Sequence, residues 1–245
     1  MSISIKMTVE SYDVQPNGNI KISSLLKYFQ KAAGDDVNRT SLGYFTLADM
    51  NIAFVLTKIN LKIYKDIKIY DEPVIITHPR KTRGASFPRD FIVKVNDEVV
   101  AVARSMWVLI DLEKRCILRP SVIDNVGSLD ISDDDLYEVD DIRRNIDVNS
   151  LLGTDVLKVA FSHLDMNRHL NNTFYSDFVF NCIGDHDRNS DAGMYMQINY
   201  KSEALLGDTL TLHFTKDCVG SEYDVVANNG DKTCFTAFVS FPKNN

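Results

Sequence analysis

The sequence of 245 residues lacks several features that would each assign it to a familiar class. Its net charge is −7, so it has no basic excess with which a general nucleic-acid binder neutralises phosphates. No stretch approaches the ~18 uninterrupted apolar residues of a membrane span. It also contains no G-x-S-x-G, H-E-x-x-H, P-loop or Rossmann fingerprint. What remains is the composition of an ordinary globular protein, 44% apolar and 25% charged.

Cysteine is scarce as well. The four residues, Cys116, Cys182, Cys218 and Cys234, form no C-x-x-C pair. The N-terminus reads Met-Ser-Ile-Ser-Ile-Lys-Met-Thr, without the apolar run of a signal peptide. We therefore expect reduced, buried or inert thiols in a cytoplasmic protein.

The first half combines one apolar helix with several strands. Apolar residues at helical spacing predict a helix from an N-cap at Ser23 to a stop at Gly34. Alternating or continuous apolar runs predict strands at 5–12, 53–64, 73–78, 86–95 and 99–111. One helix followed by several strands indicates an antiparallel sheet wrapped on a helix, not an alternating βαβ protein.

The second half repeats this plan. A strand at 157–161 and a helix at about 172–183 precede strands at 193–200, 209–215, 222–227 and 233–241. The turn at 17–24 aligns with 165–172 at a constant shift of 148, which places Lys21 opposite His169. The expected fold class is therefore α+β, a tandem of two antiparallel sheets, each wrapped around a central helix. Two such sheets could join edge to edge and cover each other's open strands.

An acidic segment separates the halves. Seven of the thirteen residues from 129 to 141 are Asp or Glu. A solvated linker is the simplest interpretation, and a regulatory acidic patch is the alternative. The predicted domains are accordingly 1–128, a linker at 129–154, and 155–245.

One turn of the second half concentrates groups that can do chemistry. Asp165, Asn167 and His169 place a carboxylate, an amide and an imidazole just upstream of the predicted helix. Helix N-termini carry free N–H groups and a positive dipole end, which suit a developing oxyanion. Imidazole is also the side chain that exchanges a proton most readily near neutral pH.

Two other interpretations of this turn stay open. Its side chains could merely form an Asx-turn and cap the helix, which we favour for Asn171 and Asn172. A metal bound by His163, Asp165 and His169 is least favoured, because the usual close ligand spacings are missing. No metal and no cofactor are expected.

The same turn resembles the acyl-acyl-carrier-protein thioesterases of plants and bacteria. Their second half carries Asp-x-Asn-x-His-x-Asn-Asn-x-x-Tyr, which is matched here by Asp165, Asn167, His169, Asn171, Asn172 and Tyr175. The resemblance extends to the segments at 103–108 and 199–203 and covers nearly the whole chain. It implies a double hotdog fold, with an acyl-chain pocket in the first half and the catalytic residues in the second.

The resemblance also implies a fourth catalytic participant, Glu203. Plant members have Glu-Cys at this place, whereas this chain has Glu203-Ala204, so no cysteine nucleophile can act there. We expect Glu203, with His169, to draw a proton from the water that attacks the thioester. Asn167 and a backbone N–H near the helix would stabilise the oxyanion, and Asp165 would orient the group. The alternative makes Asp165 or Glu203 the nucleophile of an acyl-enzyme anhydride.

The resemblance implies acyl carrier protein as partner. That protein is acidic, so a local basic patch is needed, and Arg80, Lys81 and Arg83 are the candidate substrate-binding residues. Further candidates are Lys58, Lys62, Lys65 and Lys68, although a solvated face explains all of these charges equally well. An acyl-CoA thioesterase, a non-catalytic acyl-binding hotdog protein, a hotdog dehydratase and assembly as a homodimer stay open.

Overall fold

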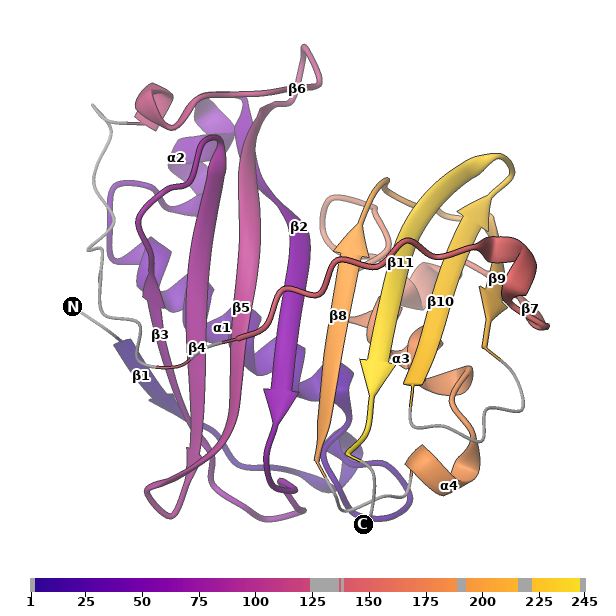
Figure 1. Ribbon diagram of the computed structural model, residues 1–245. Coiled ribbons are helices and arrows are strands. Elements are labelled where there is room, and N and C mark those ends of the chain that lie inside the picture. The colour runs from indigo at the N-terminus through magenta and orange to yellow at the C-terminus, as the bar shows by residue number, and fades with distance from the viewer. Residues whose placement is uncertain (1–2, 124–136, 138, 189–192, 216–221, 243–245) are drawn as a thin grey trace.

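The computed structural model describes residues 3–123, 137, 139–188, 193–215 and 222–242. Its dominant feature is one large antiparallel sheet with helices on one face (Figure 1). The predicted acidic segment at 129–141 lies mostly outside the described residues. None of the described helices is long and apolar enough to cross a membrane.

Among the described residues, the first half supplies six strands and two α-helices. The strands are β1 (Ile3–Lys6), β2 (Ile52–Ile63), β3 (Val74–Pro79), β4 (Ser86–Val95), β5 (Glu98–Asp111) and β6 (Cys116–Ile117). The helices are α1 (Ile22–Asn38) and α2 (Tyr44–Asp49), with 3-10 turns η1 (Ser11–Asp13) and η2 (Pro120–Ile123).

The described part of the second half repeats this order with five strands. These are β7 (Gly153–Lys158), β8 (Met194–Tyr200), β9 (Thr209–Phe214), β10 (Glu222–Asn229) and β11 (Lys232–Ser240). The helices are α3 (Phe174–Asn181) and α4 (Asp185–Arg188), and the 3-10 turns are η3 (Val148–Ser150) and η4 (Phe161–His163).

The two halves share one sheet through the pair β2 and β8. The strand order is β1-β3-β4-β5-β2-β8-β11-β10-β9-β7, with β6 pairing β5. The joint is antiparallel and runs from Lys58 opposite Asn199 to Ile63 opposite Met194. The expectation that the sheets join edge to edge is confirmed. Each half covers an edge strand of the other, which removes two open edges from solvent.

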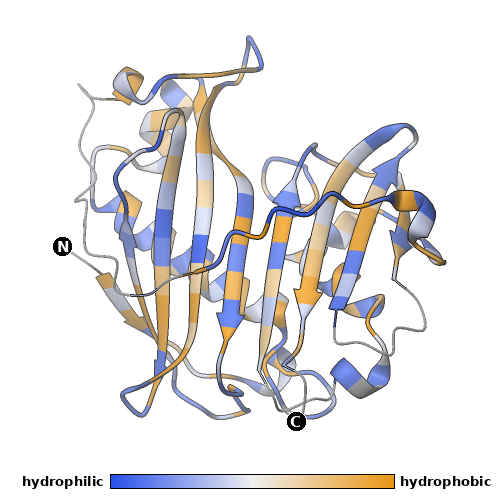
Figure 2. Cartoon of the chain, viewed as in Figure 1, coloured by the Kyte–Doolittle hydropathy of each residue, from blue (hydrophilic) through white to orange (hydrophobic). Residues whose placement is uncertain are grey.

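One apolar core runs behind the joined sheet. α1 lies against the strands of the first half and α3 against those of the second (Figure 1). Phe29 of α1 stacks on Phe91 of β4, with ring centroids 4.6 Å apart, and the same buried cluster continues to Tyr175 and Phe235. Fully burying one such side chain contributes about 1.5–3 kcal/mol. The strands show the expected alternation of polar and apolar residues (Figure 2).

Both predicted ends of the first helix were wrong. α1 begins at Ile22 after Lys21, whose side chain makes no cap, and Ser23 is buried instead. The helix also continues through Gly34 to Asn38. A glycine inside a helix costs only about 1 kcal/mol relative to alanine. The last turn gains a buried ion pair, because Asp36 lies 2.8 Å from Arg89 of β4.

The strands predicted before each helix were misplaced as well. β1 ends at Lys6 instead of residue 12, and the polypeptide then forms the 3-10 turn η1. In the second half the strand ends at Lys158, and residues 161–163 form the equivalent turn η4. The helix α3 is also shorter than predicted.

The halves repeat with a different register from the one expected. Isolated bridges join Val14 to Ile20 and Leu164 to Leu170. Because 164 minus 14 and 170 minus 20 are both 150, the true shift at this turn is 150 residues. The predicted shift of 148 was therefore wrong by two. It matched polar side chains, whereas the backbone pairing defines the turn.

This correction changes the residue of the first half that is equivalent to His169. In the first half Gln15 N–H donates to the carbonyl of Asn19, as Asp165 N–H does to that of His169. The counterpart of His169 is therefore Asn19, not Lys21. The first half still has no histidine in this turn, so the asymmetry between the halves stands.

The described part of the segment between the halves is bound to the sheet. Residues 139–150 cross the face opposite the helices, over strands of both halves (Figure 1). The carbonyl of Asp140 accepts hydrogen bonds from Asn60 Nδ2 and Tyr195 Oη, both at 2.8 Å. The side chain of Gln197 pairs with both backbone groups of Ile142. This part of the segment therefore also fastens the two halves together.

Candidate active site

The turn before α3, residues 164–170, is a tight loop whose two ends pair with each other. Leu164 bridges Leu170, and Arg168 adopts a left-handed φ of 64°. Asp165 Oδ1 accepts hydrogen bonds from the backbone N–H of Asn167 at 2.8 Å and of His169 at 3.1 Å. The Asp165 carboxylate thus organises the loop by an Asx-turn. These bonds fix the backbone that carries His169.

The loop is joined to the segment that follows β8, and this brings two predicted residues together. Leu170 N–H donates to the carbonyl of Ala204 at 2.8 Å, and His169 bridges Leu205. As a result, His169 Nε2 lies 3.3 Å from Glu203 Oε2. Both side chains are about one-third exposed, so water and substrate can reach them.

The first half has a carboxylate at the equivalent place. Equivalent bridges close the two turns: Asn19–Lys68 and His169–Leu205. Since 205 minus 68 is 137, the counterpart of Glu203 is Asp66. The imidazole, not the carboxylate, therefore distinguishes the second-half site from its counterpart.

Two residues of the first half contact this site, and the sequence offered no signal for either. Arg115 Nη2 lies 2.7 Å from Glu203 Oε1, although the residues are 88 positions apart. Tyr44 Oη lies 3.5 Å from Asn167 Oδ1, at the limit of a hydrogen bond and 123 positions away. With Oδ1 turned toward Tyr44, the Asn167 amide has its NH₂ group directed elsewhere.

The backbone at the start of α3 is largely occupied by local bonds. Asn171 Oδ1 accepts from Thr173 N–H and Oγ1, and the Asn171 carbonyl accepts from Phe174 N–H. Asn172 accepts from Tyr200 Oη at 3.1 Å and from the side chain of Gln30 on α1. Asn171 makes the expected Asx-turn, whereas Thr173 is the N-cap of α3 and Asn172 joins this turn to α1 and β8. The Thr173 and Phe174 N–H groups are therefore already bonded within the turn.

His163 and Tyr175 pack against neighbouring aromatic rings. His163 accepts a hydrogen bond from Ala160 N–H at Nδ1 and lies against the Phe174 ring, centroids 5.1 Å apart. Burial, and then the nearby Cys234 and Glu203, raise the pKa of the Tyr175 phenol. Tyr175 thus stays neutral, with its ring edge-on to Tyr200.

The cysteines described do not form a nucleophilic site. Burial raises the pKa of Cys182 to about 12, so its thiol stays protonated. Cys234 is also buried, and Cys116 is exposed on β6. Cys218 lies outside the described residues.

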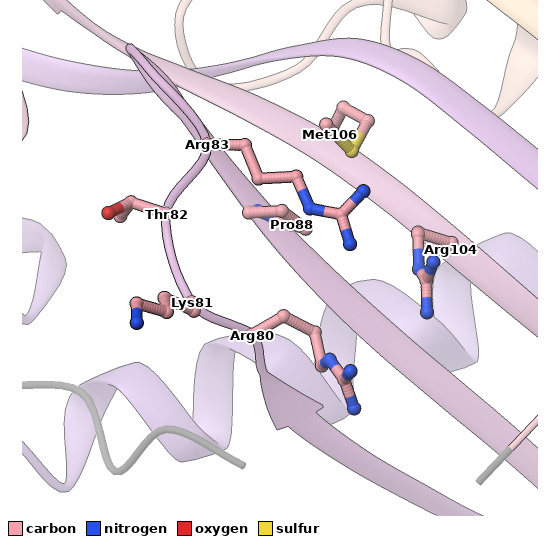
Figure 3. A pocket seen from close by; sticks show the side chains of 7 residues that line it. All are labelled: Arg80, Lys81, Thr82, Arg83, Pro88, Arg104 and Met106. Atoms are coloured by element: carbon pink, nitrogen blue, oxygen red, sulfur yellow. The ribbon is translucent and has the colours of Figure 1, made fainter. Parts of the chain in front are cut away.

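The predicted basic residues divide into buried and exposed groups. A cavity of about 320 Å³ on the sheet face away from α1 is lined by Arg80, Lys81, Thr82, Arg83, Pro88, Arg104 and Met106. Arg80 is buried, with Nε 3.8 Å from Asp90, which also holds Arg104 in a bidentate pair. Figure 3 shows Arg80, Arg83 and Arg104 extending over the strands, while Lys81 points away from them. Lys81 and Arg83 are exposed and available to a macromolecule.

Three of the four additional lysines have carboxylate partners for their side chains. Lys58 lies 2.7 Å from Asp141, Lys62 lies 4.0 Å from Asp140, and Lys65 pairs with Glu98. These pairs reduce the local positive potential along β2. Lys81 and Arg83 are therefore the stronger candidates for docking.

The described residues therefore form a duplicated antiparallel fold with a carboxylate–imidazole pair just after β8. Comparison with known families identifies it. Residues 2–126 match the acyl-ACP thioesterase N-terminal domain, and residues 153–240 match the acyl-ACP thioesterase C-terminal domain. The chain therefore belongs to the acyl-ACP thioesterase family, whose reaction is hydrolysis of fatty acyl-ACP.

Individual relatives agree. The chain is 25% identical to the oleoyl-acyl carrier protein thioesterase 2, chloroplastic, of Arabidopsis thaliana, over 93% of this chain and 67% of that protein. An acyl-ACP thioesterase from Bacteroides thetaiotaomicron has the same fold, with a TM-score of 0.85 at 20% identity and coverage of 98% of each chain. The 12:0-ACP thioesterase of Umbellularia californica gives 0.82 at 16% identity, covering 99% of this chain and 98% of its own.

Proposed function

We propose that this chain hydrolyses fatty acyl-ACP to a free fatty acid and holo-carrier protein at the site formed by Glu203, His169 and Asn167, within a double hotdog fold. The observation that carries the proposal is the 3.3 Å contact between His169 Nε2 and Glu203 Oε2. Imidazole and carboxylate in contact form a unit that can hold and move a proton near neutral pH. Ala204 follows Glu203, so the site works without a thiol.

The proposed reaction is direct attack by water on the thioester carbonyl. Glu203 takes a proton from water while the water oxygen bonds to the carbonyl carbon. His169 Nε2–H donates to the same carboxylate and keeps it in place. The Asn167 NH₂ group donates to the carbonyl oxygen as its negative charge develops. When the C–S bond breaks, the proton passes from Glu203 to the departing sulfur, which restores the carboxylate.

Glu203→Gln tests the general base. General base catalysis is worth about 10²–10⁴-fold, so kcat should fall by about that factor, measured as thiol release from acyl-ACP. The pair with His169 is about one-third exposed on both sides, and such pairs contribute about 0–1 kcal/mol to stability. The melting temperature should therefore change little. Near-normal turnover by a folded Glu203→Gln protein would reject the proposal.

Asp66→Asn is the matched control for this experiment. Asp66 occupies the position in the first half that is equivalent to that of Glu203, but its turn carries Asn19 where the second half has His169. Asp66→Asn should keep wild-type kcat. Equal losses in the two variants would show that removing either carboxylate damages the fold rather than the chemistry.

The anhydride route predicts a different fate for oxygen. Attack by a carboxylate of Asp165 or Glu203 would place an acyl group on the enzyme, and water would then cleave the anhydride. After a single turnover in ¹⁸O-water, label in the enzyme carboxylate would rule out direct attack, because direct attack labels only the fatty acid. Asp165 Oδ1 already accepts two backbone hydrogen bonds, which disfavours it as nucleophile.

We further propose that Lys81 and Arg83 bind the acidic carrier protein. Both are exposed, whereas Arg80 is buried against Asp90 and is assigned a structural role. Reversing both charges to Glu should raise KM for acyl-ACP much more than KM for acyl-CoA, and added salt should reduce the difference. Equal KM changes for the two substrates would exclude this surface.

We also propose that the first half holds the acyl chain of the substrate. The first half would enclose the acyl chain between α1 and its strands, with small and large apolar side chains setting chain length. The boundaries at 128 and 154 and a homodimer remain predictions. The cytoplasmic location also remains a prediction. The plant relative is a chloroplastic protein.

A further inference from the structure

The hairpin between β5 and β6 has a fixed conformation at its tip. The Asp111 carboxylate accepts hydrogen bonds from Glu113 N–H at 3.0 Å and Lys114 N–H at 2.8 Å. The bond from Lys114 is the main cause that lowers the pKa of Asp111. Arg115 N–H donates to the Asp111 carbonyl at 2.9 Å, with Arg115 in a left-handed conformation at φ 54°. These bonds define the direction in which the Arg115 side chain leaves the turn.

That side chain reaches across to the other half of the molecule. Arg115 Nη2 lies 2.7 Å from Glu203 Oε1, while the second oxygen, Oε2, faces His169 Nε2 at 3.3 Å. One carboxylate is therefore held at both oxygens, by a guanidinium from the first half and by an imidazole from the second. A carboxylate held at two points keeps one rotamer, whereas one held at a single point can rotate away.

We propose that Arg115 is a positioning residue for catalysis, which holds Glu203 so that Oε2 faces His169 and the attacking water. The inference rests on the proposed role of Glu203 as general base. Glu203 is about one-third exposed and follows the end of β8, so neighbouring packing restrains it little. A guanidinium is always charged and directional, which suits it to orient a carboxylate. The active site is then incomplete without the first half.

Two other roles for Arg115 make different predictions. As an exposed cation it could attract the acidic carrier protein, and its loss would then raise KM for acyl-ACP only. As a clamp between the halves it would act on stability, and its loss would lower the melting temperature. A positioning role lowers kcat with both acyl-ACP and acyl-CoA and leaves KM and melting temperature near wild type.

The first experiment measures Arg115→Ala against two variants. Small misplacement of a catalytic group can cost up to ~100-fold, so kcat should fall by roughly 10–100-fold. Arg115→Lys should restore part of the loss, because it returns the charge without the planar fork. Lys114→Ala is the matched control: it removes the same charge from the same turn, but Lys114 contacts Asp111 instead of Glu203. Its kcat should be that of wild type.

A double-mutant cycle then tests whether Arg115 acts through Glu203. Arg115→Ala should lower kcat in the wild-type background and have no further effect in Glu203→Gln. Equal losses in both backgrounds, or an unchanged kcat for Arg115→Ala while Glu203→Gln is inactive, would overturn the positioning role and leave the proposed function intact. Full activity of Glu203→Gln would instead reject the proposed function, and the positioning role with it.

Discussion

The joint between β2 and β8 places a strict demand on Gly193, which precedes β8. Its φ is +77°, and a Cβ at this residue would lie 2.5 Å from the carbonyl oxygen of Ile63. A left-handed conformation costs an L-residue about 1–2 kcal/mol. Relieving the contact requires backbone movement, and overpacking costs about 1–3 kcal/mol. Gly193→Ala should therefore lower the free energy of unfolding by about 2–5 kcal/mol, a large part of the typical 5–15 kcal/mol.

Gly230→Ala is the matched control for this prediction. Gly230 has φ +58° in the β10–β11 hairpin, and a Cβ there would meet no described heavy atom within 4 Å. It should lose only the conformational part, about 1–2 kcal/mol. Urea unfolding of the two variants gives the difference, which measures the contact with Ile63. Equal destabilisation would refute the reasoning, because the clash would then contribute nothing.

Two further predictions concern buried charged and titratable groups. Arg89→Met should lower the free energy of unfolding by about 3–5 kcal/mol, because it leaves Asp36 unpaired beside the core. Lys31→Met removes an exposed pair and should cost about 0.5 kcal/mol at most. Similar urea midpoints for the two variants would contradict this prediction. Burial lowers the pKa of His78 although Asp90 opposes it, so the folded protein resists protonation that the unfolded chain accepts below about pH 6.5. The contribution of His78 to the free energy of unfolding should be complete above that pH and should be lost as the pH falls. In urea titrations, His78→Gln should reduce the slope of this loss by up to about 1.4 kcal/mol per pH unit. The same slope in both proteins would exclude His78 as the source of the pH dependence.

Elements with a local signal were predicted closely. β4 was predicted residue for residue, and β5 begins one residue earlier than expected. Their apolar runs carry the strand period in the side chains themselves, so neighbouring residues are enough to define them. The duplicated order of strands and helices was visible for the same reason.

The ends of the helices and strands and the register of the repeat could not be predicted from neighbouring residues alone. Gly34 is an ordinary stop signal, yet α1 continues because Asp36 finds Arg89 on a strand more than fifty residues later. The shift of 148 aligned similar letters, whereas the backbone pairing of the two turns requires 150. Side-chain similarity can be matched in several registers, but a hydrogen-bonded turn has one.

The sequence by itself determined which chemical groups are present at the proposed site. It contained the Asp165, Asn167 and His169 turn, and it excluded a thiol after Glu203, because these are properties of residue type and spacing. Tertiary structure decided how those groups meet: closure of the turn against the end of β8 sets His169 beside Glu203. It also decided that Arg115, 88 residues away, completes the contact. No local pattern encodes such a pair, since it exists only when two halves share one sheet.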